Sequence, residues 1–276
     1  MLMGFAMLTL SPGQLEAYLA QYFWPFVRIG ACLMVAPAFG ARFVPPRLRI
    51  ALAGALTLLI APTITTPTGV AMLSVQGLII TLQQVLIGVA AGFVLQLVFD
   101  SLAMGGQLLA NSMGLSFAFN VDPQHGASTP VVGQLYMLIV MLTFLALDGH
   151  IALLDALLTG FKTLPVSAHG ISAASAWSVV EWGRYLFEGA LAVALPGMTA
   201  LLIVNLGFGV MSRAAPSLNM FAVGFPITLV FGLAIVLFGL PAVQASFTAL
   251  FGVALNALGG LLGGVSSGSA MQTSGA

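Results

Sequence analysis

Charged residues are scarce in this sequence. Of its 276 residues only 14 are Asp, Glu, Lys or Arg, which is 5% of the chain, whereas an average globular chain has about 25%. Hydrophobic residues make up 60%, and the mean hydropathy is +1.11. Such a chain cannot cover itself with a polar surface, and it lacks the clustered Lys and Arg that nucleic-acid binding requires. We therefore expect an all-α, polytopic membrane-type protein or a subunit buried in an apolar assembly.

Residues that carry catalytic or metal chemistry are equally few. The one cysteine, Cys32, excludes an intrachain disulfide and lies in an apolar run, where it is expected to pack as a small buried hydrophobe. The one lysine, Lys162, is not part of a Walker A loop, and the run Gly114–Ala118 lacks the final glycine of a nucleophile elbow. The three histidines lack the spacing of metal ligands. These gaps predict a protein that is not an enzyme and has no metal or cofactor.

The first apolar segment, residues 15–39, contains a charge near its middle. Arg28 at such a depth costs about 2.5–3.5 kcal/mol on insertion scales, so it should face protein or water, with Glu16 or Asp100 as a partner. A side chain that extends to a nearby membrane interface is the alternative. The segment's environment is therefore predicted to be partly protein.

The second segment is too short to cross a bilayer. Residues 50–61 precede Pro62, and a membrane span needs about 17–25 residues. The preceding turn carries Arg42, Arg47 and Arg49, which by the positive-inside tendency places it in the cytoplasm if the flanking segments span. Helix caps or ion pairs within an assembly are the other interpretation.

A polar and small-residue ridge runs along the third segment, residues 78–99. Its members recur at every fourth position, so on a helix they form one stripe. Glycines at this spacing let helices approach closely, and amides can bond to a neighbouring helix. We expect the ridge to face protein; it consists of Gln84, Gly88, Gly92, Gln96 and Asp100.

Residues 101–126 are apolar but interrupted by glycine, which predicts non-helical backbone surrounded by protein or lining a cavity. Residues 131–147 and 151–163 then read as helices, the second stopped by Pro165.

In the C-terminal part, Ser178 and Glu181 have capping-box spacing, and Arg184 lies between Glu181 and Glu188 at the spacing of helical ion pairs. This helix is expected to continue to Met211 with a kink at Pro196. Pro241 divides the last apolar residues into two stretches, 227–240 and 242–262, while the Ser- and Gly-rich tail is expected to be disordered.

Several ordered motifs resemble one family. The most specific is the stretch ArgAlaAlaProSerLeuAsnMetPheAlaValGlyPhePro at 213–226. Others are the ProPro turn within 37–49, the run MetGlyLeuSerPheAla at 113–118 with Asp122 and Pro123 after it, and an AspGlyHis turn at 148–150 with LeuPro at 164–165. Together they make the chain similar to the flagellar biosynthesis protein FliR family, export-gate subunits of type III secretion systems with injectisome counterparts.

The resemblance implies an architecture and partners. It implies a FliP-like helical part over residues 1–185, a FliQ-like helical hairpin over 186–262 and a tail over 263–276. Members assemble with FliP and FliQ into a closed channel for unfolded flagellar substrates, with FlhB and FlhA nearby. The expected place is the flagellar basal body in the bacterial inner membrane, with the gate projecting toward the periplasm and its helices packed against other subunits.

Specific residues follow from the same resemblance. A plug loop falls on residues 106–122, where soft apolar side chains and glycines suit a gate that closes by dewetting; an ordinary buried loop is the alternative. Its members are Gly106, Met113, Gly114, Leu115, Phe117 and Phe119. An assembly role, with Arg213 buried at a helix break, is expected for Arg213, Pro216, Asn219, Phe221, Gly224, Phe225 and Pro226.

A different class of function stays open on the residues alone. A small-solute secondary transporter would use intramembrane Arg28, Asp100 and His150 as a coupling relay. Such a protein would be stable alone or as a homo-oligomer, whereas a gate subunit would require unlike partners.

Overall fold

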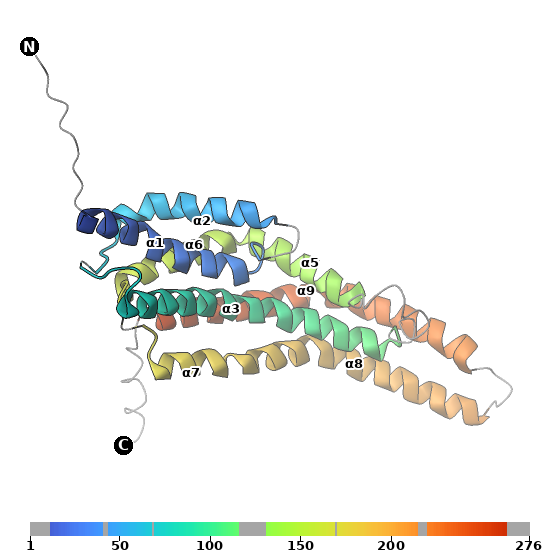
Figure 1. The fold of residues 1–276 in the computed structure, drawn as a ribbon. Coiled ribbons are helices and arrows are strands. Elements are labelled where there is room, and N and C mark those ends of the chain that lie inside the picture. Colours follow the sequence, from blue (N-terminus) through green and yellow to red (C-terminus); the bar gives the residue numbers. More distant parts are fainter. Residues whose placement is uncertain are drawn as a thin grey trace, which may run out of the picture. The chain divides into compact units, whose positions relative to one another are not determined.

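The computed structural model describes residues 12–40, 44–67, 69–115, 131–168, 170–214 and 220–263. Within these ranges every regular element is a helix (Figure 1). The chain divides into two compact units: one holds the residues up to 93, 153–178 and those from 257 on, and the other holds 94–152 and 179–256. Each unit therefore combines segments that are distant in the sequence. The division of the chain into FliP-like and FliQ-like parts stays a prediction.

In the first unit, helix α1 (Pro12–Val35) is followed along the chain by helix α2 (Pro46–Ile60). Pro45 is extended (φ −58°, ψ 140°) and Pro46 is the first helical residue, where a missing N–H costs nothing. The ProPro motif thus starts α2. The helix has 15 residues and is followed by the short 3₁₀ helix η1 (Ala61–Thr63), so the prediction that this segment is too short to span is confirmed.

Helix α3 (Val75–Ser112) has 38 residues. Its first turn is capped by Ser74, whose Oγ accepts the Gly77 N–H at 3.1 Å. The expectation of non-helical backbone from residue 101 is wrong as far as Ser112. The glycines at 105 and 106 do not stop the helix, because they lie where it packs closely on Ala190 and Gly133, and that packing outweighs their low helix propensity.

The chain continues with α5 (Val131–Ala146), α6 (Gly149–Thr163), α7 (Ala173–Glu181) and α8 (Gly183–Ala214). The capping box at Ser178 is wrong. The helix begins five residues earlier, where the Ser172 Oγ accepts the Ser175 N–H at 3.0 Å, and the Ser178 hydroxyl donates to the Ser175 carbonyl. Pro196 lies inside α8, as predicted.

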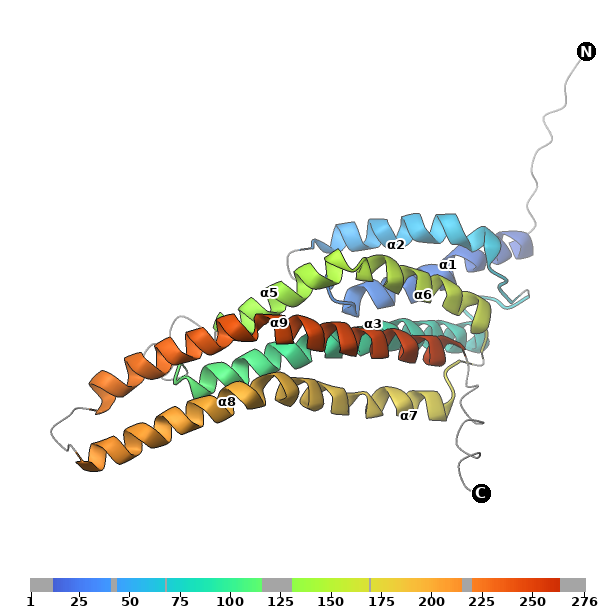
Figure 2. The same cartoon turned by 180° about the vertical axis from the view of Figure 1, so that it is seen from behind.

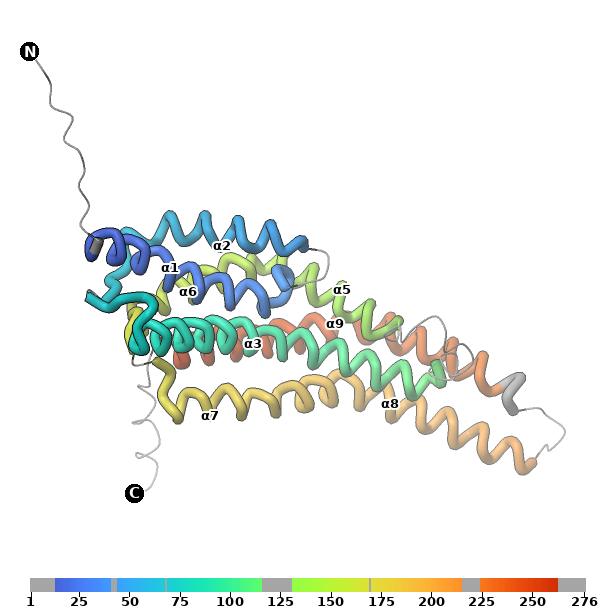
Figure 3. The backbone as a smooth tube through the Cα atoms, in the orientation of Figure 1, coloured from blue at the N-terminus to red at the C-terminus, as the bar shows by residue number. Residues whose placement is uncertain are grey.

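The last helix, α9 (Met220–Gly263), has 44 residues and contains both Pro226 and Pro241. Figure 3 draws it as one continuous element. The expected division at Pro241 is therefore wrong. A proline costs an interior helix about 3 kcal/mol, which the packing of a long apolar helix can offset. Within the second unit α8 and α9 lie side by side, as both views show (Figures 1 and 2).

Three described helical segments are long and apolar enough to cross a membrane. They are Val75–Ser112 (α3), Ala173–Ala214 (α7 and α8 taken together) and Gly224–Leu262 (most of α9). The bent pair α5 and α6 adds a fourth if it forms one broken span. The protein is therefore an all-α polytopic membrane protein, as its composition predicts.

Candidate functional site

The N-terminal half of the polar ridge packs against α1. Gln84, Gly88 and Gly92 are buried. A Cβ at Gly88 would collide with the Arg28 carbonyl oxygen, and one at Gly92 would lie 2.8 Å from the Cys32 oxygen. Only glycine allows this approach of the two backbones. Within the first unit the ridge therefore meets protein, and its role in assembly stays a proposal.

Arg28 is completely buried in the first unit. Its guanidinium donates hydrogen bonds to the Leu164 carbonyl (2.8 Å) and the Gly160 carbonyl (3.3 Å). It also lies over the Phe161 ring, 4.4 Å from the centroid. Burial lowers the pKa of Arg28 to about 10, so it stays a cation at neutral pH. The arginine thus caps the C-terminal end of α6, where it adds a donor to the last carbonyls and where the helix dipole favours a positive charge.

The carboxylate partners expected for Arg28 are wrong. Carbonyl oxygens take the place of Glu16 and Asp100. Asp100, in the second unit, accepts a hydrogen bond from Gln96 at 2.9 Å, and both of these side chains are half-buried. Gln84 is fully buried, and its amide has no hydrogen-bond partner among the described residues. Cys32 is buried beside Arg28 as a free thiol, which confirms the prediction of a small apolar group.

Of the six residues assigned to the plug, four are described by the structure and two are not. Gly106 lies inside α3, where a Cβ would be 2.9 Å from the Gly133 Cα. Met113 is buried against Gly232 of α9. Leu115 is half-buried, and Phe117 and Phe119 lie outside the described residues.

Gly114 ends α3. It has φ +79°, and the N–H groups of Gly114 and Leu115 bond to the Asn111 and Ala110 carbonyls at 3.0 and 3.1 Å. This is a Schellman cap, in which a left-handed residue favours glycine. The MetGlyLeu part of the motif is thus a helix stop next to a buried methionine.

Four phenylalanines form an aromatic cluster in the second unit. Phe99 contacts Phe144 and Phe247 edge-on, with ring centroids 5.3 and 5.5 Å apart. Phe251 contacts Phe144 edge-on at 5.6 Å and stacks on Phe247 at 5.6 Å. The cluster joins α3, α5 and α9. The sequence does not predict this cluster, because only the spacing of Phe247 and Phe251 is a local signal.

The AspGlyHis turn separates α5 from α6. Asp148 is left-handed (φ +53°), a conformation that Asp tolerates better than most residues. The Phe144 ring lies directly against Gly149, so a Cβ there would overlap the ring and lie 3.0 Å from the Phe144 carbonyl oxygen. His150 follows half-buried, and its Nδ1 has no hydrogen-bond partner among the described residues.

We expect Gly149→Ala to lower the free energy of unfolding by about 2 kcal/mol, because the methyl group overpacks the space taken by the Phe144 ring. Gly252→Ala on α9 is the matched control, since nothing lies within 4 Å of a Cβ at Gly252. Unfolding of the detergent-solubilised protein measures both. The explanation fails if Phe144→Leu, combined with Gly149→Ala, shows no favourable coupling between the two sites.

The 213–226 motif connects α8 to α9. Arg213 lies in the last turn of α8, a position that suits the helix dipole, and it is exposed. The side chain is thus not buried by this chain alone, and its burial and assembly role in the complex stay a prediction. Pro216 and Asn219 lie outside the described residues, whereas Phe221, Gly224, Phe225 and Pro226 belong to the first turns of α9.

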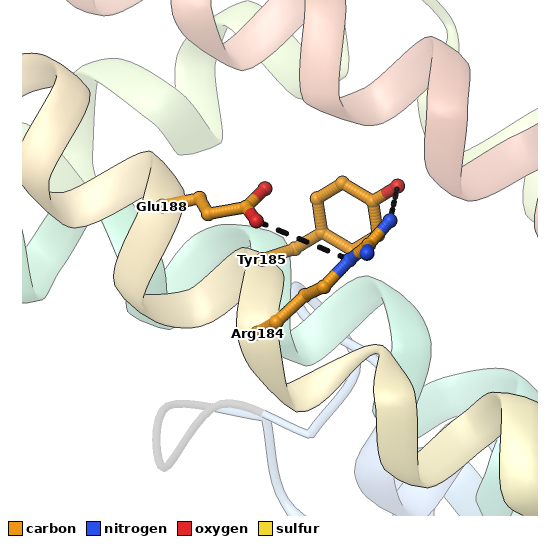
Figure 4. Close-up of polar contacts among 3 residues, drawn as sticks. All are labelled: Arg184, Tyr185 and Glu188. Carbon is orange, nitrogen blue, oxygen red and sulfur yellow. Dashed lines mark hydrogen bonds and ion pairs between the residues drawn. The ribbon is translucent and has the colours of Figure 1, made fainter.

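An exposed charged cluster lies at the start of α8 (Figure 4). The Arg184 Nε is 4.0 Å from the Glu188 carboxylate, which confirms a predicted helical ion pair. Arg184 also donates to the Tyr185 hydroxyl at 3.1 Å and lies over its ring at 4.8 Å. Trp182 packs on Tyr185. Because the charged groups are exposed, this cluster adds little stability.

No group of three metal-binding side chains occurs within the described part of the chain.

Most of the exposed surface of the long helices is apolar. In their most apolar windows, 17% of Ala173–Ala214 and 22% of Gly224–Leu262 is buried, against 44% for Val75–Ser112. The large side chains exposed on α8 and α9 include Phe187, Leu191, Leu195, Leu202, Ile203, Leu206, Val210, Val230, Phe231, Leu233, Leu237 and Phe238.

Comparison with known proteins places the chain in a family. Residues 19–254 match the bacterial export proteins, family 1. The chain is 38% identical over 264 residues to the flagellar biosynthetic protein FliR of Pectobacterium carotovorum subsp. carotovorum, covering 95% of this chain and 100% of the relative. It is 34% identical over 256 residues to FliR of Escherichia coli (strain K12), covering 93% and 98%.

A more distant relative, FliR of Bacillus subtilis (strain 168), is 28% identical over 205 residues, which is 73% of this chain and 79% of the relative. The family match over residues 19–254 includes Arg28, Gly88, Gly92, all of α8 and most of α9. The chain therefore belongs to family 1 of the bacterial export proteins, the family of the flagellar biosynthetic protein FliR, and is a membrane-associated component of the flagellar export apparatus.

Proposed function

We propose that the chain is a non-enzymatic core subunit of the flagellar type III export gate. In this proposal it joins FliP and FliQ in a closed helical channel through which unfolded flagellar substrates leave the cytoplasm, with FlhB and FlhA beside it. The gate lies in the basal body at the inner membrane and projects toward the periplasm. Energy comes from other components.

One observation supports this proposal most strongly: α8 and α9 expose large apolar side chains over most of their length. Phe238 is 82% exposed, and α9 has no charged residue in 44 positions. A surface of this size must be covered by lipid or by other helices. Family membership favours sister subunits of the export apparatus as the cover.

Cross-linking at α9 tests the assembly. The photo-reactive amino acid p-benzoylphenylalanine replaces Phe238 in the full chain, expressed in flagellated cells. We expect cross-links to FliP or FliQ, together with co-purification of these unlike subunits. A tagged chain that purifies alone or as a homo-oligomer, with only lipid attached at position 238, would contradict the proposal and favour the transporter.

The transporter has weaker support from the side chains. Arg28 is held by two carbonyl oxygens and an aromatic ring, an arrangement that suits a fixed cap. A relay residue would instead need to exchange partners during transport.

The plug is the second part of the proposal, and the structure narrows where to test it. Residues 106–112 belong to α3, so removing them would shorten a packed helix. A deletion of 116–122 keeps the helix and its Gly114 cap. We expect the complex with FliP and FliQ to form normally but to leak ions in vesicles, because the apolar closure is lost. Unchanged conductance of a correctly assembled complex would remove the plug assignment.

A further inference from the structure

An apolar groove lies between α1 and α2 in the first unit. It has a volume of about 410 Å³ and is lined by Leu19, Tyr22, Phe23, Phe26, Gly54, Thr57 and Leu58. Gly54 leaves part of it open, since nothing lies within 4 Å of a Cβ built there. The volume is at the lower end of the range for small-ligand sites, about 300–1,000 Å³.

The lining favours an apolar occupant. The Thr57 hydroxyl already donates to the Ala53 carbonyl at 2.6 Å. The other lining residues, Tyr22 apart, carry no side-chain polar group. A polar ligand would lose its hydrogen bonds to water on entering and find few replacements. A hydrocarbon chain has no hydrogen bonds to water to lose, so it enters the groove without this cost.

A positive charge lies at one end of the α2 face that lines the groove. Arg47 is exposed in the first turn of α2, and it lies seven and eleven residues before Gly54 and Leu58. That spacing puts all three on one face, with Arg47 about 10 Å along the axis from Gly54. Arg49 is held at this end by its hydrogen bond to the Val44 carbonyl. The face thus presents a cationic end followed by an apolar trough.

Helix α2 is long enough for an acyl chain of one bilayer leaflet to lie along it. Helix α2 has 15 residues and is about 22 Å long. One leaflet has a hydrocarbon thickness of about 15 Å, half of the bilayer core. A 10 Å length of α-helix, about 10 Å across, fills about 800 Å³, which is twice the volume of the groove. A single acyl chain is thinner than a helix, so the groove suits an acyl chain better than a helix.

The geometry points to a phospholipid site: an acyl chain lies in the α1–α2 groove, and an anionic headgroup, phosphatidylglycerol or cardiolipin, pairs with Arg47. The site is independent of the proposed gate function. It goes beyond general membrane association because it specifies one groove, one cation and an anionic class of lipid.

Cross-linking from within the groove tests the site. In the full chain, p-benzoylphenylalanine replaces Leu58, which lines the groove and is 68% exposed. Irradiated cells are extracted, the tagged protein is purified, and the adducts are identified by mass. We expect phospholipid adducts enriched in anionic lipids relative to the cell membrane.

Two variants test the two ends of the site separately. Arg47→Gln should reduce the anionic enrichment about fivefold, the effect of one basic residue at an anionic membrane surface. Gly54→Leu should abolish adducts of any lipid by filling the groove, and nearby atoms leave room for the new side chain. Gly239→Leu on α9, also open around its Cβ, is the control and should change neither result.

Three outcomes would overturn the site. One is a cross-link from position 58 to another polypeptide or to residues 1–11 of this chain. Another is lipid adducts with the composition of the bulk membrane. The third is adducts that Gly54→Leu and Gly239→Leu affect equally. Because the gate proposal is tested at Phe238, either proposal can fail without the other.

Discussion

Replacing Arg28 with methionine is expected to lower the free energy of unfolding by about 3 kcal/mol. The variant removes two charge-assisted hydrogen bonds, worth about 1.5–3 kcal/mol each. It leaves the Leu164 carbonyl without its side-chain donor, whereas the Gly160 carbonyl keeps the Leu164 N–H at 2.9 Å. Relief of the buried charge offsets part of this loss. Denaturant titration of the detergent-solubilised protein, followed by tryptophan fluorescence, measures the change.

Arg184→Met is the matched control. Arg184 also lies over an aromatic ring and donates one hydrogen bond, but its side chain is 64% exposed. We expect little change in stability. Arg28→Lys should fall between the two, because a lysine cannot donate to both carbonyls while stacking on Phe161. Equal losses for Arg28→Met and Arg184→Met would contradict the capping role.

A single methyl group at Gly88 is expected to lower the free energy of unfolding by an amount similar to that of Arg28→Met. Gly88→Ala places a Cβ against the Arg28 carbonyl oxygen, 2.9 Å from the Ala31 Cβ and 3.1 Å from the Cys32 nitrogen. Two of these atoms are backbone and cannot rotate away, so α1 and α3 must separate. Overpacking of this kind costs about 1–3 kcal/mol, and we expect the upper end.

Gly30→Ala on α1 should have the opposite sign. Nothing lies within 4 Å of a Cβ at Gly30, and alanine improves helix propensity by up to about 1 kcal/mol. The same titration compares the two variants. Two alanine variants that shift stability in the same direction would show that the α1–α3 seam does not require glycine.

Local patterns in the sequence predicted those features that depend on neighbouring residues. Apolar runs predicted the helices, and the four-residue spacing of Gly88 and Gly92 predicted a close helix seam. The end of α6 before Pro165 also followed from the chain itself. These signals rest on helix periodicity and proline geometry, which need no knowledge of distant contacts.

Features that depend on distant residues were not predictable in this way. The partners of Arg28 are backbone carbonyls 132 and 136 residues away, and a carbonyl carries no sequence signal. Likewise, nothing local joins Phe99 to Phe247. Pro241 was expected to divide a helix because the rule for a single proline ignores the packing of the 44-residue helix around it. The plug residues Phe117 and Phe119 lie outside the described residues.

The separation between Arg28 and its acceptors has a consequence for biosynthesis. The arginine leaves the ribosome 136 residues before Leu164 does. At about 5–20 residues per second, the nascent chain holds an uncapped cation in an apolar helix for roughly ten seconds. During that interval α1 cannot reach its final surroundings, so the insertion machinery or a chaperone must shelter it until α6 is made.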